Sequence, residues 1–274
     1  MKLLIAVDME GISGVVNWDQ VDPSHAEYQR FRQIMTEDVN AAIQGAASAG
    51  ATEFVVADGH WNSTNILIDK LDPRARLNSG SPSPFSMVQG VDSGVDAAFF
   101  IGYHARAGSL NAILDHTWSS IRVANVWLNG RLTGEFGMNA AVCGHFDAPV
   151  LMISGDQTVC AEALEWVPGV ETAQVKKAVG RFAAECLPLK ETRKLIHETA
   201  EHALRNFVAG KYPPPLKIKT PVTIKLEFQA QNMADSAVIM PGAKRLDGRI
   251  IEFKAPDMVA AYLAFRSAVG LAAR

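Results

Sequence analysis

The sequence is poor in cysteine, which argues against a fold stabilised by several disulfide bonds, as many small secreted proteins are. Its 274 residues contain three cysteines, Cys143, Cys160 and Cys186. An odd number without CxxC spacing argues against both a disulfide framework and a thiolate zinc site. We expect the three thiols to be small buried side chains, because free cysteine is among the most buried residue types.

Long apolar runs and blocks of one charge are also missing. No apolar run reaches the roughly 18 residues needed to cross a bilayer, and no basic stripe indicates a nucleic-acid partner. The opening MKLLIAV resembles a signal peptide only until Asp8 interrupts it. With 48% hydrophobic and 20% charged residues and a net charge of −3, the composition is that of a globular protein. We therefore expect a cytoplasmic protein that binds neither nucleic acid nor membrane.

Several catalytic motifs are absent as well. The sequence has no GxGxxG after a strand and no GxxxxGK[ST], so dinucleotide and P-loop nucleotide binding have no support. It has neither the GxSxG elbow of serine hydrolases nor the HExxH helix of zincin proteases. Any hydrolytic activity must therefore use another arrangement of side chains.

The patterns that are present alternate between strand and helix. Such alternation implies crossover units, so we predict an α/β fold with a mostly parallel sheet and flanking helices. An Asn129-Gly130 pair between apolar runs predicts a hairpin of residues 123–128 and 131–135. The predicted strands are 3–7, 52–57, 97–101 and 149–155, and the predicted helices are 28–49, 137–146, 159–165 and 189–208.

The pattern changes after Lys211. A proline-rich connection, KYPPPLKIKTP, leads to two half-exposed strand patterns, TIKLEF and RIIEFKA, and to a closing helix, PDMVAAYLAFRSAVGLAAR. We predict an α/β metal-binding body over residues 1–155. A helical connection and a smaller C-terminal α+β region should occupy residues 156–274, across a soft boundary that allows both parts to pack as one unit.

Carboxylates and histidines follow the ends of the predicted strands. Asp8 and Glu10 follow the first strand, His60 the second and His104 the third, while Glu135 follows the hairpin between two glycines. Ligands of open α/β sheets bind outside the carboxyl ends of the strands. We therefore expect these five side chains to converge.

Three carboxylates and two imidazoles suit zinc, and less well manganese or iron. Five donors exceed what one catalytic zinc takes, whereas a bridging carboxylate, for which Asp8 is the best placed, lets them hold two ions. Taken singly, each residue also has a simpler interpretation. A lone Asp at a strand end commonly forms a turn, and a lone His commonly bonds its neighbours.

Ordered motifs along nearly the whole chain resemble the D-aminopeptidase DppA family of zinc metallopeptidases. They are AVDMEGISG, FRQIMTEDVNAA, PFSMVQG, FFIGYHARAG, LDHTWS, NGRLTGEFGMNA, PVLMISGD, MPGAKRLDGR and FKAPDMVAAYLAF. The resemblance implies an aminopeptidase with two zinc ions per subunit, which releases the N-terminal residue of short peptides, including D-amino-acid peptides such as D-Ala-D-Ala. It also implies a homo-oligomer, a ring-shaped decamer, whose active sites face an enclosed channel.

The resemblance also implies roles for individual residues. Asp8 would bridge the two metal ions, Glu10 and His104 would complete one site, and His60 and Glu135 the other. The catalytic residue of the family falls on His116 of LDHTWS, as a proton carrier or a nucleophile; we favour proton transfer. The chain departs from the family pattern at Gly59 and Trp61, where serine and glycine are usual, so a changed substrate pocket is expected.

Two other functions stay open at this point. One is a binuclear hydrolase of another amide, an L-peptide or a phosphoester, because a fold does not fix its chemistry. The other is a non-catalytic, metal-dependent peptide-binding assembly. Two residues near the predicted ligands have open roles: Asp58 either orients His60 or forms a turn, and Arg106 either binds a substrate carboxylate or is solvated.

Overall fold

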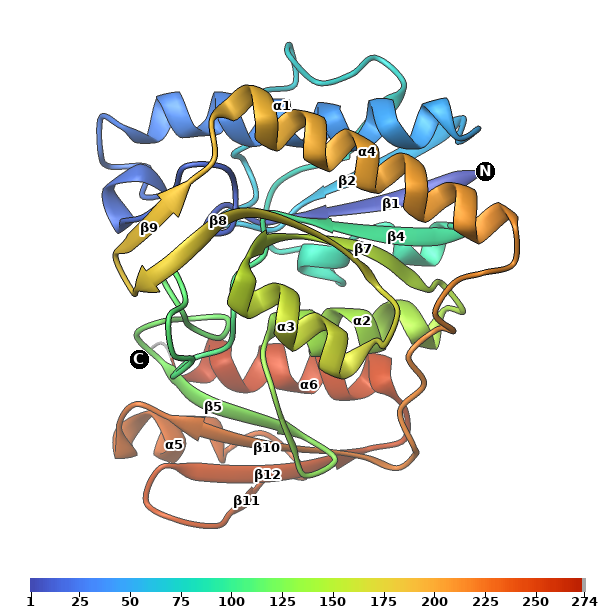
Figure 1. The fold of residues 1–274 in the computed structure, drawn as a ribbon. Coiled ribbons are helices and arrows are strands. Elements are labelled where there is room, and N and C mark those ends of the chain that lie inside the picture. Colours follow the sequence, from blue (N-terminus) through green and yellow to red (C-terminus); the bar gives the residue numbers. More distant parts are fainter. Residues whose placement is uncertain (273–274) are drawn as a thin grey trace.

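The computed structural model describes residues 1–272 and contains two β-sheets separated by a layer of helices (Figure 1). The first sheet has seven strands in the order β3-β2-β1-β4-β7-β8-β9, parallel except for the β8–β9 pair. The predicted α/β fold with a mostly parallel sheet is thereby confirmed. Its strands are β1 (Lys2–Val7), β2 (Glu53–Asp58), β3 (Ala75–Asn78), β4 (Ala97–Ile101), β7 (Val150–Asp156), β8 (Glu171–Gly180) and β9 (Ala183–Cys186).

The second sheet is antiparallel and has five strands in the order β11-β12-β10-β5-β6. Val222–Phe228 (β10) buries every second residue, as expected of a sheet with one face in the core. The other strands of this sheet are β5 (Val123–Leu128), β6 (Arg131–Thr133), β11 (Lys244–Arg245) and β12 (Ile250–Ala255).

Helices cover both faces of the first sheet. In Figure 1, α1 and α4 lie above it, α2 and α3 lie below it, and α6 lies between the two sheets. The buried positions of α4 recur at intervals of three and four residues, which is the spacing of an amphipathic helix. Among the described residues 1–272, the six α-helices are α1 (Tyr28–Ser48), α2 (Glu135–His145), α3 (Gln157–Trp166), α4 (Leu189–Val208), α5 (Gln231–Ala237) and α6 (Met258–Leu271). Three short 3-10 turns cover Trp18–Gln20, Ser86–Val88 and Val91–Ser93.

Strand β1 shows why the apolar runs of this sequence are continuous. Leu3, Ile5 and Val7 face the core under α1 and α4, whereas Leu4 and Ala6 face the core shared with the second sheet. Since side chains of a strand alternate between its faces, a strand buried on both sides must be apolar at every position. Polar side chains are then favoured where the strand ends, as at Asp8 directly after β1.

Some sequence predictions need correction. Glu135 is not in the second strand of the hairpin: that strand ends at Thr133, Gly134 is extended, and Glu135 begins α2. Strands β3, β8, β9 and β11 and helix α5 were not predicted. Cys186 is exposed, because it ends the edge strand β9, whereas the other two cysteines are buried as expected.

The two sheets do not divide at residue 155. The first sheet takes β8 and β9 from beyond that residue, and the second takes β5 and β6 from before it. The ranges 1–155 and 156–274 therefore stay a prediction about folding units and do not correspond to one sheet each. Within residues 1–272, no helix combines the length and the apolar character that a membrane span requires.

Candidate metal centre

Three strands deliver the predicted residues to one edge of the first sheet. Val7, the last residue of β1, is paired with Asp58 of β2 and with Ile101 of β4, so these strands end level with one another. The loops that begin there carry Asp8 and Glu10, His60, and His104. All four are buried, with 2–5% of their surface exposed.

The fifth side chain comes from the layer between the sheets. Glu135 is the first residue of α2, is 4% exposed, and accepts a hydrogen bond from the backbone N–H of Trp118 at 2.6 Å. Gly134 before it must be glycine, because a Cβ there would lie 2.7 Å from Oε1 of Glu162 and 2.8 Å from the Cβ of Arg106. The close backbone approach that the flanking glycines predicted is thus present.

The five side chains meet around Asp8. His60 Nδ1 lies 3.4 Å from Asp8 Oδ1 and 3.0 Å from Glu10 Oε2. His104 Nε2 lies 3.3 Å from Asp8 Oδ2 and 3.3 Å from Glu135 Oε1. The two oxygens of Asp8 therefore face two different histidine–glutamate pairs, which is the position that a bridging carboxylate requires.

Other combinations of the same atoms also come together. Asp8, Glu10 and His104 offer ligand atoms within 4.8 Å of one another, as do His104, Glu135 and His116. The shortest contacts pair Glu10 with His60 and Glu135 with His104, whereas the family resemblance implies Glu10 with His104. The division of the ligands between two ions stays a prediction.

Two atoms at the centre of the cluster have no hydrogen-bond partner within residues 1–272. They are Asp8 Oδ2 and His104 Nε2, and both are buried. A buried polar atom without a partner costs free energy, about 1–3 kcal/mol each. An ion between these two ligand atoms would remove that cost, so the residues present fit a metal centre.

His116 stands beside this cluster. Its ring stacks on the ring of His104 at 3.9 Å with an interplanar angle of 10°, and Trp18 packs edge-on against it at 5.5 Å. Its Nε2 lies 3.8 Å from Glu10 Oε1 and 3.9 Å from Glu135 Oε1. His116 thus faces both glutamates without a direct hydrogen bond to either.

The three histidines at this centre, His60, His104 and His116, are oriented in the same way. One ring nitrogen of each contacts a backbone carbonyl, and the other points at the carboxylates. A fixed outer hydrogen bond of this kind is usual for histidines that bind metal ions. The carbonyls are those of Val21 at 2.8 Å from His60 Nε2, Ala105 at 3.0 Å from His104 Nδ1 and Leu114 at 2.8 Å from His116 Nδ1.

The electrostatics of the cluster follow from burial. Burial by itself raises the pKa of Asp8, but the imidazoles of His104 and His60 that face its two oxygens hold that pKa well below its usual range. Burial lowers the pKa of His116, and the adjacent His104 lowers it further. Within residues 1–272, no lysine or arginine pairs with the carboxylates of Asp8, Glu10 or Glu135. The cluster therefore holds more buried negative charge than its imidazoles balance.

A buried lysine fixes the loop behind the cluster. Lys176 of β8 donates from Nζ to the carbonyl oxygens of Glu10 at 2.6 Å, Ile12 at 3.0 Å and Val15 at 2.8 Å. Burial lowers its pKa to about 8. Nothing in the sequence marks this residue, because a lysine inside a strand pattern is ordinarily exposed.

Asp58 and Arg106 do not contact the ligand side chains in the roles considered for them. Asp58 does not orient His60; its oxygens accept hydrogen bonds from the backbone of Asn65 and Ile66 and from the Asn65 side chain, so it shapes the loop. Arg106 donates to Ser109 and does not line the pocket in front of the cluster.

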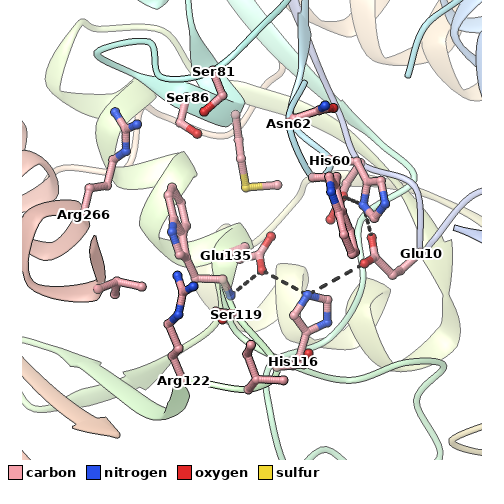
Figure 2. A pocket seen from close by; sticks show the side chains of 18 of the residues that line it. Glu10, His60, Asn62, Ser81, Ser86, His116, Ser119, Arg122, Glu135 and Arg266 are labelled. Atoms are coloured by element: carbon pink, nitrogen blue, oxygen red, sulfur yellow. Dashed lines mark hydrogen bonds and ion pairs between the residues drawn. The ribbon is translucent and has the colours of Figure 1, made fainter. Parts of the chain in front are cut away.

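That pocket has a volume of about 720 Å³, within the range of small-molecule sites. Figure 2 shows Glu10, His60, His116 and Glu135 around it. Gly59 and Trp61 line it, and Trp61 adopts a left-handed backbone conformation (φ 52°) that glycine takes more readily. The lining residues outside the cluster include Trp18, Trp61, Trp118, Arg122 and Arg266.

A buried group of carboxylates and imidazoles at the mouth of an α/β sheet is the kind of centre that metal-dependent hydrolases use. Comparison with known proteins also points to a hydrolase. The family model Peptidase M55, described as D-aminopeptidase, matches residues 1–267, and the chain belongs to that family. The family expected from the sequence motifs is thus confirmed.

Individual relatives cover the whole chain. A D-aminopeptidase of Bacillus subtilis (strain 168) is 40% identical over 275 residues, which is 100% of this chain and 98% of the relative. The solved structure of the Zn-dependent D-aminopeptidase DppA from Bacillus subtilis, described as a self-compartmentalizing protease, superposes with a TM-score of 0.96 at 39% identity. It covers 100% of this chain and 98% of that one.

Proposed function

We propose that this chain is a di-zinc aminopeptidase that releases the N-terminal residue from short peptides, D-amino-acid peptides such as D-Ala-D-Ala among them. The observation that carries the proposal is the common orientation of His60, His104 and His116, each held by a backbone carbonyl with its free nitrogen toward buried carboxylates. The D-aminopeptidase family and the zinc-dependent relative support it.

The ligands that we assign to the two ions are Asp8, Glu10, His60, His104 and Glu135, with Asp8 as the bridge. Imidazole nitrogens and carboxylate oxygens are the donors that catalytic zinc takes. Bound zinc supplies Lewis-acid chemistry, which polarises a peptide carbonyl and makes water more acidic. The backbone carbonyls of Val21 and Ala105 keep both histidine ligands in the required tautomer.

His116 is the group that we assign to proton transfer. Its Nδ1 is fixed by Leu114, so Nε2 is the atom free to accept or donate a proton in the pocket. Stacking on His104 and the edge contact with Trp18 hold the ring in place. The leaving amine of a cleaved peptide needs a proton, and an imidazole provides it at neutral pH.

The assembly and the location of the protein are proposed on narrower grounds. The relative DppA is described as self-compartmentalizing, which supports a homo-oligomer of this chain. The ring-shaped decamer and the cytoplasmic location stay predictions.

The experiment that tests the proposal measures product release from D-Ala-D-Ala, L-Ala-L-Ala and a chromogenic phosphate ester. Each substrate is given to the parent protein, to chelated protein and to protein with zinc returned. We expect D-peptide cleavage that chelation abolishes and zinc restores. Cleavage of the phosphate ester alone would contradict the aminopeptidase, as would zinc binding with turnover of no substrate.

Two variants test the role of His116. His116→Ala should lower kcat for the D-peptide by about 100-fold or more, because general acid–base catalysis contributes at least that much. The exposed His145 lies outside the pocket, so His145→Ala is the matched control and should match the parent. Equal rates in the two variants would remove His116 from the mechanism.

A further inference from the structure

We propose that Arg122 binds the C-terminal carboxylate of the substrate, so that the pocket selects short peptides with a free C-terminus. This inference rests on the proposed peptidase function and adds its substrate class. The metal-ligand side chains and the arginines line different sides of the pocket. Figure 2 places Glu10 and His60 on one side of the view and Arg122 and Arg266 on the other, with Glu135 and His116 between them.

Arg122 is half-buried and lines the pocket, but its guanidinium has no polar partner among the described residues. Within residues 1–272, that guanidinium makes neither an ion pair nor a hydrogen bond. Partly burying a cation without a counter-charge is unfavourable, whereas a carboxylate accepts two parallel hydrogen bonds from an arginine. A ligand with a carboxylate would supply the missing partner.

The backbone around Arg122 is held firmly, which fixes where the side chain starts. Its N–H donates to Ser119 O at 3.1 Å, and its carbonyl accepts from the N–H of Gln229 at 2.8 Å. Four residues earlier in the same loop, Trp118 donates its N–H to the Glu135 carboxylate at 2.6 Å. The loop therefore connects Arg122 to the metal centre, so the backbone from which the arginine side chain extends has a fixed position relative to that centre.

The other arginines near the centre are less suited to this role. Arg266 also lines the pocket, but its Nη1 donates to the carbonyl oxygens of Ser83 and Pro84, and the guanidinium lies 5.9 Å from the Trp118 ring. Arg106, the other candidate for a substrate carboxylate, lies outside the pocket and contacts Ser109.

A short peptide matches this arrangement. Its N-terminal residue would lie at the metal centre, where its peptide bond must be cleaved, and its C-terminal carboxylate would lie at Arg122. Fixing both ends would set the register and limit the length, because each added residue lengthens an extended chain by about 3.3–3.6 Å. A peptide amide, which lacks the terminal charge, would lose one of the two contacts.

The experiment compares D-Ala-D-Ala with its C-terminal amide in two readouts. The first is kcat/KM with zinc-loaded enzyme. The second is affinity from tryptophan fluorescence, since three tryptophans line the pocket. We expect the parent to prefer the free acid by about 10- to 100-fold, because a charge-assisted, bidentate contact is lost with the amide. Arg122→Met should abolish the preference by weakening the acid and leaving the amide unchanged, and Arg122→Lys should restore part of it.

The matched control is Arg76→Met, which removes an exposed arginine of β3 outside the pocket and should keep the parent's preference. Equal treatment of acid and amide by the parent, or a preference that survives Arg122→Met, would overturn the inference while peptide cleavage itself stands. If the parent cleaves neither compound, the proposed peptidase function fails and the fluorescence decides: an acid preference lost in Arg122→Met supports the carboxylate site, and its absence refutes it.

Discussion

Replacing Lys176 by methionine tests how the fold positions its first carboxylates. Methionine keeps most of the apolar stem but removes the ammonium, which donates to three backbone carbonyls of the loop that carries Glu10. Those carbonyls are buried with the lysine, so no solvent replaces the lost donor. The variant therefore isolates one charged group that acts on the loop and not on the ligands themselves.

The expected loss of stability is a difference between two effects. Each carbonyl left without a donor costs about 1–3 kcal/mol. Removing the buried ammonium returns its desolvation penalty, which is several kcal/mol. We expect Lys176→Met to lower the free energy of unfolding by about 2–4 kcal/mol, and zinc affinity by about 10- to 100-fold, because groups behind the ligands typically contribute that much.

Denaturant unfolding of zinc-free protein measures the first quantity, and competition with a chelator of known affinity measures the second. Lys177→Met is the matched control, because Lys177 is the next residue of β8 and is exposed. It should stay within about 0.5 kcal/mol of the parent. A Lys176→Met variant with the parent's stability and zinc affinity would refute the role of Lys176 in holding this loop.

Three further predictions concern titration, packing and the metal. Burial raises the pKa of Asp38 from 3.8 to about 6, so the stability that its protonated form contributes is present below 3.8 and is lost as the pH rises through 6. Asp38→Asn should remove this pH-dependent contribution of about 3 kcal/mol to the free energy of unfolding. Denaturant unfolding of parent and variant across this pH range measures the difference. Gly11→Ala should cost at least about 3 kcal/mol or prevent folding, because its Cβ would lie 1.8 Å from Tyr103 O, whereas Gly248→Ala meets nothing within 4 Å and should unfold like the parent. Chelation should lower the melting temperature in calorimetry, and returned zinc should restore it, because a ligand that binds only the folded chain stabilises it; an unchanged melting temperature would contradict a metal that the fold binds.

The sequence predicts the strands whose pattern is a continuous apolar run or a clear alternation, and it misses strands without either pattern, such as β3, β8 and β9. The apolar runs that became β1 and β4 are continuous because both faces are in a core. Strand β8 escapes notice because its buried Lys176 breaks the apolar pattern. The place of the 123–133 hairpin could not be predicted either, since Leu128 pairs with Ile224, a residue far along the chain.

The candidate site is predictable where topology alone places a residue. Asp8, His60 and His104 follow strands that end level with one another, so a parallel sheet brings them together. The groups that orient the histidines are backbone carbonyls, which carry no sequence signal. Arg122 is likewise hidden, because an arginine in a pocket and one on the surface look alike in a sequence.

The central claim is that the carboxylates and histidines around Asp8 bind two zinc ions that together make the protein a peptidase. The most direct test counts zinc per chain by mass spectrometry while zinc is returned to chelated protein, and follows alanine release from D-Ala-D-Ala in the same samples. We predict about two ions per chain, with full activity only when both have bound. Full activity with one ion, or with none, would contradict the account.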